Sequence, residues 1–261
     1  MKTKKMTTIL LSLLLLAGTG QNVFSQSLTG KEIVDKTYNR PTGDDQVSEL
    51  RMTLINSRGD TRVREIKQFT KDMGDVEKSI MFFTAPADVK NTSFMNWTYD
   101  DDRNDDQWIY LPALRRVKRI SSDSKSDYFM GSDFTYDDLG DRKLEEDTHK
   151  LLREETINGK TCYVVESIPV DEDYMYSKTV TWIEKETFIG VKKEFYDEMG
   201  DHLKTLTIRE YKNFDGFDII TSSEMHNVQK DHRTQMKLSN IKINSGVSDN
   251  MFTERMMTRG I

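Results

Sequence analysis

The chain has 261 residues and a formal net charge of −6, with 36% hydrophobic and 10% aromatic residues. This composition, with only four Pro, predicts an ordered globular protein and excludes an intrinsically disordered chain. The net negative charge argues against nucleic acid as a partner and makes anionic membrane surfaces poor general partners.

The N-terminus has the three parts of a secretory signal peptide. Three Lys among the first five residues precede an apolar run at 9–17, and small and polar residues follow. That run is shorter than the roughly 20 apolar residues of a membrane-spanning helix, which argues against an uncleaved anchor. We expect a signal peptide at 1–25, cleaved before Gln26, and one exported domain at 26–261.

The predicted mature chain has 236 residues and a net charge of −9, because the removed segment carries three Lys and no acidic residue. Its length suits a single domain. Cys162 is the only Cys, so no internal disulfide can form and the fold must depend on its core. No Cys follows the apolar run of the signal peptide, so a lipid-attachment Cys is not expected.

Hydrophobic periodicity predicts a mainly β chain. A helix is expected from Thr29, where Glu32 completes a capping box. Leu50, Met52 and Leu54 then alternate with polar and charged residues, as in a half-buried strand. Similar patterns between 47 and 111 and between 149 and 244 predict about eleven strands, and they favour a strongly bent antiparallel sheet.

Turn and helix signals complete this pattern. Asn158-Gly159 is the strongest hairpin signal in the chain. A charged insert at 141–147 separates the two groups of strands and is expected to form a helical turn. The tail 249–257 is expected to be a short helix capped by Ser248 or Asp249.

An Asp-rich loop raises the hypothesis of a calcium site. Asp100, Asp102 and Asn104 match the first three ligand positions of an EF-hand loop. However, Asp105 stands where Gly is needed for the turn, and Leu111 stands where a bidentate Glu is needed. The EF-hand is therefore excluded. A solvated hairpin tip is the preferred interpretation, with a looser calcium turn as the alternative.

No catalytic or metal-binding constellation is present in the sequence. The four His do not show the helical pairing with Glu of a zinc protease. Ser132 lacks the Gly-x-Ser-x-Gly context of a nucleophile elbow, and Cys162 stands in an apolar strand, as a core residue does. We expect no enzymatic activity, no metal and no cofactor. A lipid-acting hydrolase is the least favoured alternative, since no nucleophile–base pair can be named.

One stretch, residues 108–139, combines aromatic, basic and acidic segments in close succession: WIYLPALRRVKRISSDSKSDYFMGSDFTYDDL. An aromatic strand ends at Pro112, a basic run follows, and a second aromatic and acidic segment closes the stretch. In the basic run, Leu114, Val117 and Ile120 recur every three residues between Arg and Lys, which an exposed face without a ligand also explains.

This stretch closely resembles the signature region of the outer-membrane lipoprotein-sorting protein-like family. The resemblance rests on Leu111-Pro112, Arg115-Arg116, Phe129-Met130-Gly131-Ser132-Asp133-Phe134 and Tyr136-x-Asp138-Leu139, in that order. More diffusely, it extends from about Thr29 to the C-terminus. It implies an incomplete β-barrel with helices as a lid over an apolar cavity. It also implies binding of acyl chains, and a longer branch of the family that resembles companions of inner-membrane exporters.

The predicted function is therefore a periplasmic carrier and not an enzyme. It would bind acyl chains of lipids or lipoproteins and pass them between membrane partners, in outer-membrane lipoprotein sorting or lipid export. An inner-membrane exporter and transient membrane contact are the expected partners. The alternative is a periplasmic sensor or adaptor that binds an export or signalling protein.

Candidate residues follow from this prediction. Those expected to line the apolar cavity are Leu50, Met52, Leu54, Phe82, Trp97, Trp108, Tyr110, Phe129, Phe134 and Trp182. Those expected to dock a lipid head group or a partner are Arg115, Arg116, Lys118 and Arg119. The aromatic and acidic segment is expected to fold back over the cavity at Gly131, with Asp133 and Asp138 paired with the basic run.

Overall fold

The computed structural model describes residues 27–101 and 103–261. The predicted signal peptide and its cleavage site therefore lie outside the described residues. Within the described part of the chain, no helix combines the length and the apolar character that crossing a membrane requires.

A single antiparallel sheet of thirteen strands forms most of the fold. The strands are β1 (Asp45–Ile55), β2 (Thr61–Asp72), β3 (Val76–Ala85), β4 (Ser93–Tyr99), β5 (Asp106–Leu111), β6 (Arg116–Arg119), β7 (Asp147–Ile157), β8 (Lys160–Pro169), β9 (Lys178–Glu184), β10 (Gly190–Tyr196), β11 (His202–Phe214), β12 (Phe217–Asn227) and β13 (His232–Ile243). Their order in the sheet is β6-β5-β4-β3-β2-β1-β13-β12-β11-β10-β9-β8-β7, so two meanders meet where β1 pairs with β13.

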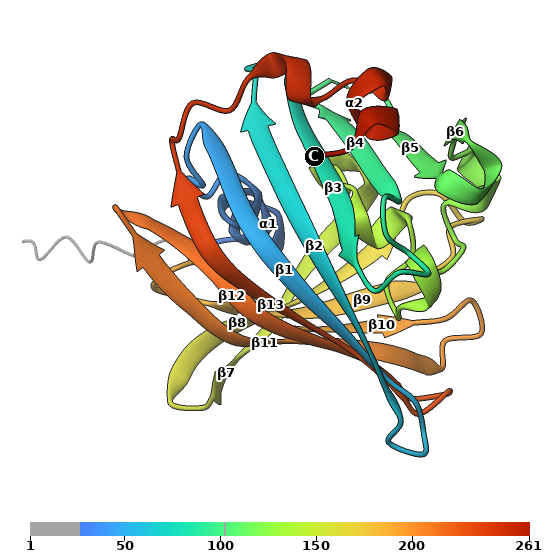
Figure 1. Ribbon diagram of the computed structural model, residues 1–261. Coiled ribbons are helices and arrows are strands. Elements are labelled where there is room, and N and C mark those ends of the chain that lie inside the picture. The colour runs from blue at the N-terminus through green and yellow to red at the C-terminus, as the bar shows by residue number, and fades with distance from the viewer. Residues whose placement is uncertain (1–26, 102) are drawn as a thin grey trace, which may run out of the picture.

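The sheet curves strongly without closing, and β6 and β7 remain its two edges (Figure 1). This confirms the predicted fold class, a mainly β protein built on a bent sheet that forms an incomplete barrel. The prediction of about eleven strands did not include β6, where the basic run was interpreted as an exposed face or a docking edge and not as a strand. Val117 of β6 in fact lies opposite Tyr110 of β5.

Local sequence signals explain the strands and their connections. Leu50, Met52 and Leu54 are buried, and the residues between them are exposed or half-buried, as the alternation predicted. Asn158 and Gly159 have φ values of 51° and 79°, the left-handed backbone that a tight two-residue hairpin requires. The hairpin predicted there joins β7 to β8.

Directly opposed residues define two faces of the sheet, because successive side chains of a strand point to opposite faces. Leu54 of β1, Met225 of β12 and Val165 of β8 are connected by directly opposed pairs on neighbouring strands, so their side chains lie on the same face of the sheet. We call the face that carries these three side chains the inner face. Helix α1 (Gly30–Tyr38), which has the predicted capping box, packs Ile33 and Val34 against Val165 inside the curve of the sheet (Figure 1).

Helix α2 (Glu254–Arg259) covers the opposite, outer face. It follows a 3-10 turn at Asp249–Met251, in the tail where a short helix was predicted. Phe252 and Met257 of this tail pack against Phe82 and Met95 of β3 and β4. Only α1, and not α2, is therefore placed to act as an inner lid.

The connection between β6 and β7, the two edges of the sheet, crosses the inner face, where its Phe129 packs with Leu50 and Met52. Residues 120–146 make this connection and are called the crossing segment. It contains four 3-10 turns: Ser122–Ser124, Phe129–Gly131, Asp137–Leu139 and Leu144–Glu146. The last of these is the helical turn expected in the charged insert.

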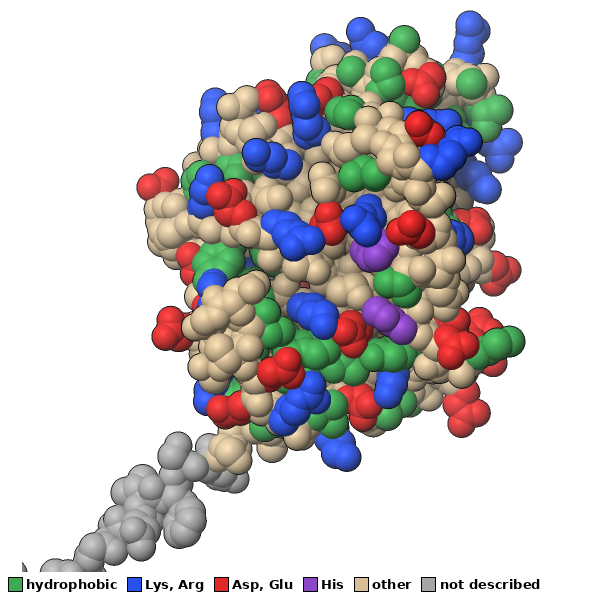
Figure 2. Space-filling model, turned by 90° about the horizontal axis from the view of Figure 1, so that it is seen from below, with side chains coloured by type: hydrophobic (Ala, Val, Ile, Leu, Met, Phe, Trp, Pro, Cys, Tyr) green, Lys and Arg blue, Asp and Glu red, His purple; other side chains and the backbone are tan. Residues whose placement is uncertain are grey.

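The molecular surface seen from below carries basic and acidic side chains interspersed, with small groups of hydrophobic side chains between them (Figure 2). A surface of this kind is well solvated and offers no extended single-sign patch on that face.

Candidate functional site

The centre of the crossing segment is packed into the core of the inner face. Phe129 is fully buried, and its ring lies 5.1 Å from that of Phe94 and 6.0 Å from that of Phe83, between ring centroids. Met130 and Gly131 then adopt φ values of 48° and 73°, which reverses the chain at the predicted position. Phe129 therefore occupies the space that an inner-face ligand would need.

Asp133 anchors the next turn of the crossing segment to β13. Its carboxylate accepts hydrogen bonds from Thr234 Oγ1 at 2.7 Å and contacts His232 Nδ1 at 2.8 Å, and the side chain is buried. A buried carboxylate needs such partners, because an unpaired one carries a large desolvation cost. The contact fixes this turn to the inner face.

Asp138 forms a second anchor. Lys204 Nζ of β11 lies 2.5 Å from Asp138 Oδ2 and also donates to the carbonyl oxygen of Asp133 at 3.1 Å. Tyr176 donates its hydroxyl to the other oxygen of Asp138 at 3.0 Å. Burial, reinforced by the charge of Asp138, raises the pKa of Tyr176, so its hydroxyl keeps the proton that it donates.

These contacts correct the predicted pairing of Asp133 and Asp138 with the basic run. Both carboxylates point to β11 and β13, whereas the basic run lies on edge strand β6 and on the turn before it. Sequence reasoning missed His232 and Lys204, since a single cation in an alternating strand resembles an exposed residue. Their partners are 99 and 66 residues away along the chain.

The predicted cavity residues lie on both faces of the sheet. Leu50, Met52, Leu54 and Phe129 belong to one inner cluster, and Phe134 to a neighbouring inner cluster with Tyr176, Phe195 and Met225. Phe82, Trp97, Trp108 and Tyr110 pack with the tail that carries α2 on the outer face. Trp182 lies with Cys162 and Val164, also on the outer face. The ten residues therefore do not line one cavity.

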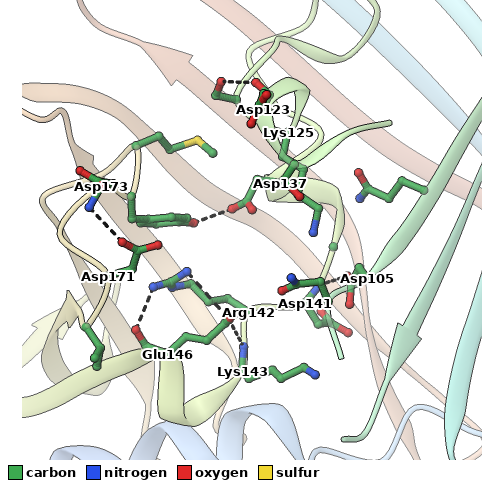
Figure 3. Close-up of a pocket in the computed structure, with 18 of the residues that line it drawn as sticks. Asp105, Asp123, Lys125, Asp137, Asp141, Arg142, Lys143, Glu146, Asp171 and Asp173 are labelled. Carbon is green, nitrogen blue, oxygen red and sulfur yellow. Dashed lines mark hydrogen bonds and ion pairs between the residues drawn. The ribbon is translucent and has the colours of Figure 1, made fainter. Parts of the chain in front are cut away.

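A polar cleft of about 750 Å³ opens beside the crossing segment (Figure 3). Nine carboxylate side chains line it, against three basic ones, and we call it the acidic cleft. The carboxylates are Asp105, Asp123, Asp137, Asp141, Glu145, Glu146, Asp171, Asp173 and Glu198, and the basic residues are Lys125, Arg142 and Lys143. Such a lining disfavours an acyl chain and favours cationic or hydroxyl-rich groups.

Carboxyl groups on the inner face near the acidic cleft hold protons more tightly than usual. Burial raises the pKa of Asp105. Burial and the nearby charge of Asp141 raise the pKa of Glu77 to about 7. Crowded carboxylates with few cations resist ionisation, because like charges repel in a poorly solvated site.

A smaller pocket of about 200 Å³ adjoins the acidic cleft and shares Arg142 and Tyr174 with it. The Arg142 guanidinium lies 3.7 Å from the Tyr174 ring centroid and 2.7 Å from a carboxylate oxygen of Asp147. Phe134 and Phe195 contribute apolar wall, and Lys193 contributes an amine. Burial lowers the pKa of Lys193, and no described carboxylate lies within ion-pair distance of it.

The basic run forms an exposed edge beside α2. Arg115 sits in a left-handed turn with a φ of 50°, and β6 follows it at the sheet edge. Leu114, which precedes these charges, is 66% exposed. Arg119 is paired with Asp106, while Arg115, Arg116 and Lys118 have no ion-pair partner among the described residues.

No three His, Cys, Asp or Glu side chains of the described residues are grouped as metal ligands commonly are. His149 Nδ1 lies 2.8 Å from Ser167 Oγ, and its Nε2 lies 3.0 Å from the Leu144 carbonyl oxygen. Because His149 and Ser167 are directly opposed on β7 and β8, this contact also serves to join the two strands.

Comparisons with known proteins agree with this architecture. A family model described as an uncharacterized protein matches residues 75–259, and no curated protein matches the chain. The chain is similar to the crystal structure of a putative outer membrane lipoprotein-sorting protein domain from Vibrio parahaemolyticus, with 36% identity over 88% of this chain and 98% of that one, at a TM-score of 0.82.

Two further solved structures are similar. A DUF1329 family protein from Desulfovibrio piger has 29% identity over 87% of this chain and 97% of that one, at a TM-score of 0.83. A LolA superfamily protein from Nitrosomonas europaea has 22% identity over 88% of this chain and 99% of that one, at a TM-score of 0.67, and supports the fold alone.

Proposed function

The chain belongs to the outer-membrane lipoprotein-sorting protein-like family, and we propose that it is a periplasmic carrier that binds acyl chains of lipids or lipoproteins. In this proposal the carrier passes its cargo between membrane partners, one of which is an inner-membrane exporter. It acts by binding and release and not by catalysis.

The observation that carries the proposal is the covered inner face. Phe129 and Phe134 fill the space over an apolar sheet surface, and the segment that bears them is held by a few buried polar contacts. Release of those contacts would expose apolar surface to a ligand without unfolding the sheet. An acyl chain could then take the place of the apolar side chains of the crossing segment on the sheet surface.

Energetics support such an exchange. Burial of an acyl chain contributes about 0.8 kcal/mol per methylene group, so a dozen methylenes contribute roughly 10 kcal/mol before ordering costs. Displacing Phe129 and Phe134 would cost part of that gain. Loading is therefore expected to need a membrane partner, in line with transient docking at a membrane.

The basic run would provide that docking. Arg115, Arg116 and Lys118 are exposed beside Leu114, an arrangement suited to anionic head groups with shallow apolar insertion. Arg119 would contribute only after separation from Asp106. The overall negative charge of the chain would limit this contact to the basic edge and keep it transient.

The decisive experiment is identification of bound lipid. The protein purified gently from a bacterial host should carry lipid by native mass spectrometry or organic extraction, and the delipidated protein should take up a fluorescent fatty acid. Consistently empty protein with no uptake would refute the carrier.

The acidic cleft favours a second candidate, a sensor or adaptor that binds a protein partner. The more apolar of the two adjoining pockets, at about 200 Å³, is smaller than the roughly 300–1,000 Å³ of ligand pockets in general. Capture of an export or signalling protein by a variant unable to bind acyl chains would favour this candidate over the carrier.

A further inference from the structure

Three buried oxygen atoms have no hydrogen-bond donor among the described residues; two belong to side chains that line the acidic cleft, and the third belongs to the residue directly opposed to one of them. They are Asn96 Oδ1, Asp105 Oδ1 and Gln107 Oε1. Asn96 is 5% exposed and Gln107 is 1% exposed, so solvent access does not explain their lack of a partner. Buried polar groups are nearly always paired, and three unpaired acceptors together point to a missing ligand.

The surrounding hydrogen bonds fix the orientation of these groups. Gln107 donates its Nε2 to the Tyr136 carbonyl oxygen at 2.9 Å, and Asn96 donates its Nδ2 to Thr98 Oγ1 at 2.9 Å. Thr98 in turn donates to Asp105 Oδ2 at 3.2 Å. Each amide nitrogen is thereby hydrogen-bonded on the side away from the unpaired oxygen, so turning either amide to bring its nitrogen to the unpaired position would lose that bond.

The three side chains are neighbours, and Thr98 links Asn96 to Asp105. Asn96 and Gln107 are directly opposed on β4 and β5, and Asp105 stands two residues before Gln107, immediately before β5 begins. Gly140 lies over them: a Cβ atom there would stand 2.4 Å from Asp105 Oδ2 and 3.5 Å from Gln107 Nε2. The glycine backbone thus closes over the floor of the cleft where a side chain could not fit.

The charge of the region favours a cation. Glu77 of β3 is directly opposed to Thr98, so it adds a second carboxylate to the same face, and no described cation forms an ion pair with Glu77 or Asp105. Asp105 is one of the nine carboxylates that line the cleft. The negative potential of these carboxylates would attract a cation into the cleft before it reaches any ligand.

We infer that Asn96, Asp105 and Gln107 form the floor of a calcium site, completed by water in the acidic cleft. The unpaired atoms are all oxygens, from one carboxylate and two amides, which are donors that Ca²⁺ accepts in flexible geometry. Mg²⁺ demands a smaller octahedron and retains its waters, so it should bind more weakly. With few charged ligands, the dissociation constant should fall in the range of roughly 10⁻⁴–10⁻³ M.

Calorimetric titration of the metal-free full chain with Ca²⁺ tests the site, and Tb³⁺ luminescence locates it. Trp97 and Trp108 adjoin Asn96 and Gln107 in sequence, on the opposite face of the same strands, and can sensitise a bound lanthanide. One site is expected, with Ca²⁺ displacing Tb³⁺. Absence of binding up to about 10 mM Ca²⁺, or tighter binding of Mg²⁺ than of Ca²⁺, would overturn the inference.

Two matched variants distinguish a specific calcium site from general electrostatic attraction of cations to the acidic cleft. Asp105→Asn should weaken Ca²⁺ binding about tenfold or more, since a ligand charge is lost. Asp123→Asn makes the same charge change in the same cleft, at a position that Figure 3 shows well apart from Asp105, and should leave affinity within about twofold. Equal weakening by both would show diffuse attraction only and would refute the site.

A variant expected to bind Ca²⁺ more tightly tests the site in a way that a loss of folding cannot imitate. Asn96→Asp keeps the shape of the side chain and adds a ligand charge, so it should tighten Ca²⁺ binding several-fold. It should also make the thermal midpoint more dependent on calcium than that of the unmodified chain. Unchanged or weaker binding by a folded Asn96→Asp protein would contradict the assignment of Asn96 as a ligand.

Discussion

Lys204 Nζ of β11 lies 2.5 Å from Asp138 Oδ2 of the crossing segment, and both side chains are withdrawn from solvent. This ion pair joins the sheet to the segment that crosses its inner face. Removal of one partner from a buried pair costs about 3–5 kcal/mol, because the remaining charge is left uncompensated. The pair is therefore well placed to control how firmly the crossing segment is held.

Lys204→Met should accordingly lower the free energy of unfolding by about 3–5 kcal/mol in denaturant titrations. The double variant Lys204→Met/Asp138→Asn should recover part of that loss, because no charge is left alone. Hydrogen exchange should accelerate in the crossing segment before it does so in the sheet strands. A uniform acceleration over the whole chain would show that the pair supports the fold in general and not this segment.

Phe129→Ala tests whether the crossing segment occupies ligand space. Loss of a fully buried ring should cost about 3–5 kcal/mol and leave a cavity on the inner face. If the carrier proposal is correct, uptake of a fluorescent fatty acid should increase. Phe82→Ala is the matched control, since Phe82 is 2% exposed and lies on the outer face. Equal changes in uptake by both variants would count against an inner-face site.

Several of these features could be predicted from the sequence, and others could not. The alternation of Leu50, Met52 and Leu54 and the turn at Asn158-Gly159 depend on neighbouring residues, so local patterns sufficed. The sequence did not indicate which side chains of β3 to β5 point to the inner face, because both faces of these strands are buried. Phe83 packs against Phe129 on the inner face, and Phe82 packs against the C-terminal tail on the outer face. Aromatic residues of both faces were consequently assigned to one cavity.

The partners that anchor the crossing segment could not be predicted from local sequence patterns, for a different reason. Asp133 and Asp138 were correctly singled out as paired carboxylates, but the basic run was taken as their partner. The actual partners come from β11 and β13, which the curvature of the sheet brings to the inner face. The unpaired oxygens of Asn96 and Gln107 likewise depend on where Tyr136 and Gly140 lie above them.

The basic edge should mediate contact with anionic lipid. Arg115→Glu/Arg116→Glu should weaken binding to phosphatidylglycerol vesicles by at least about tenfold, since each cation near a membrane contributes roughly 1 kcal/mol and reversal adds repulsion. The thermal midpoint should change little, because both side chains are exposed. Vesicle co-sedimentation at several salt concentrations gives the measurement.

A control for that variant lies in the turn between β1 and β2, which are central strands of the sheet and not its β6 edge. Arg58→Glu/Arg62→Glu makes the same charge change at two exposed positions in and after the turn between β1 and β2. It should leave vesicle binding and acyl uptake closer to those of the unmodified chain. If vesicle binding, acyl uptake and partner capture all persist in Arg115→Glu/Arg116→Glu, the basic run is scaffold and has no docking role.

Glu77 should make stability depend on pH in the calcium-free protein. Burial and nearby carboxylates raise its pKa from the ordinary 4.5 to about 7, so the folded chain holds this proton more tightly than the unfolded chain. Stability from this group is fully present below pH 4.5 and is lost as the pH rises through 7, by at most about 3 kcal/mol. Glu77→Gln cannot ionise, and it should remove most of this loss when unfolding in denaturant is compared at pH 5.5 and pH 8, below and above the folded pKa. A slope that survives in Glu77→Gln would assign the titration to another carboxyl of the cleft.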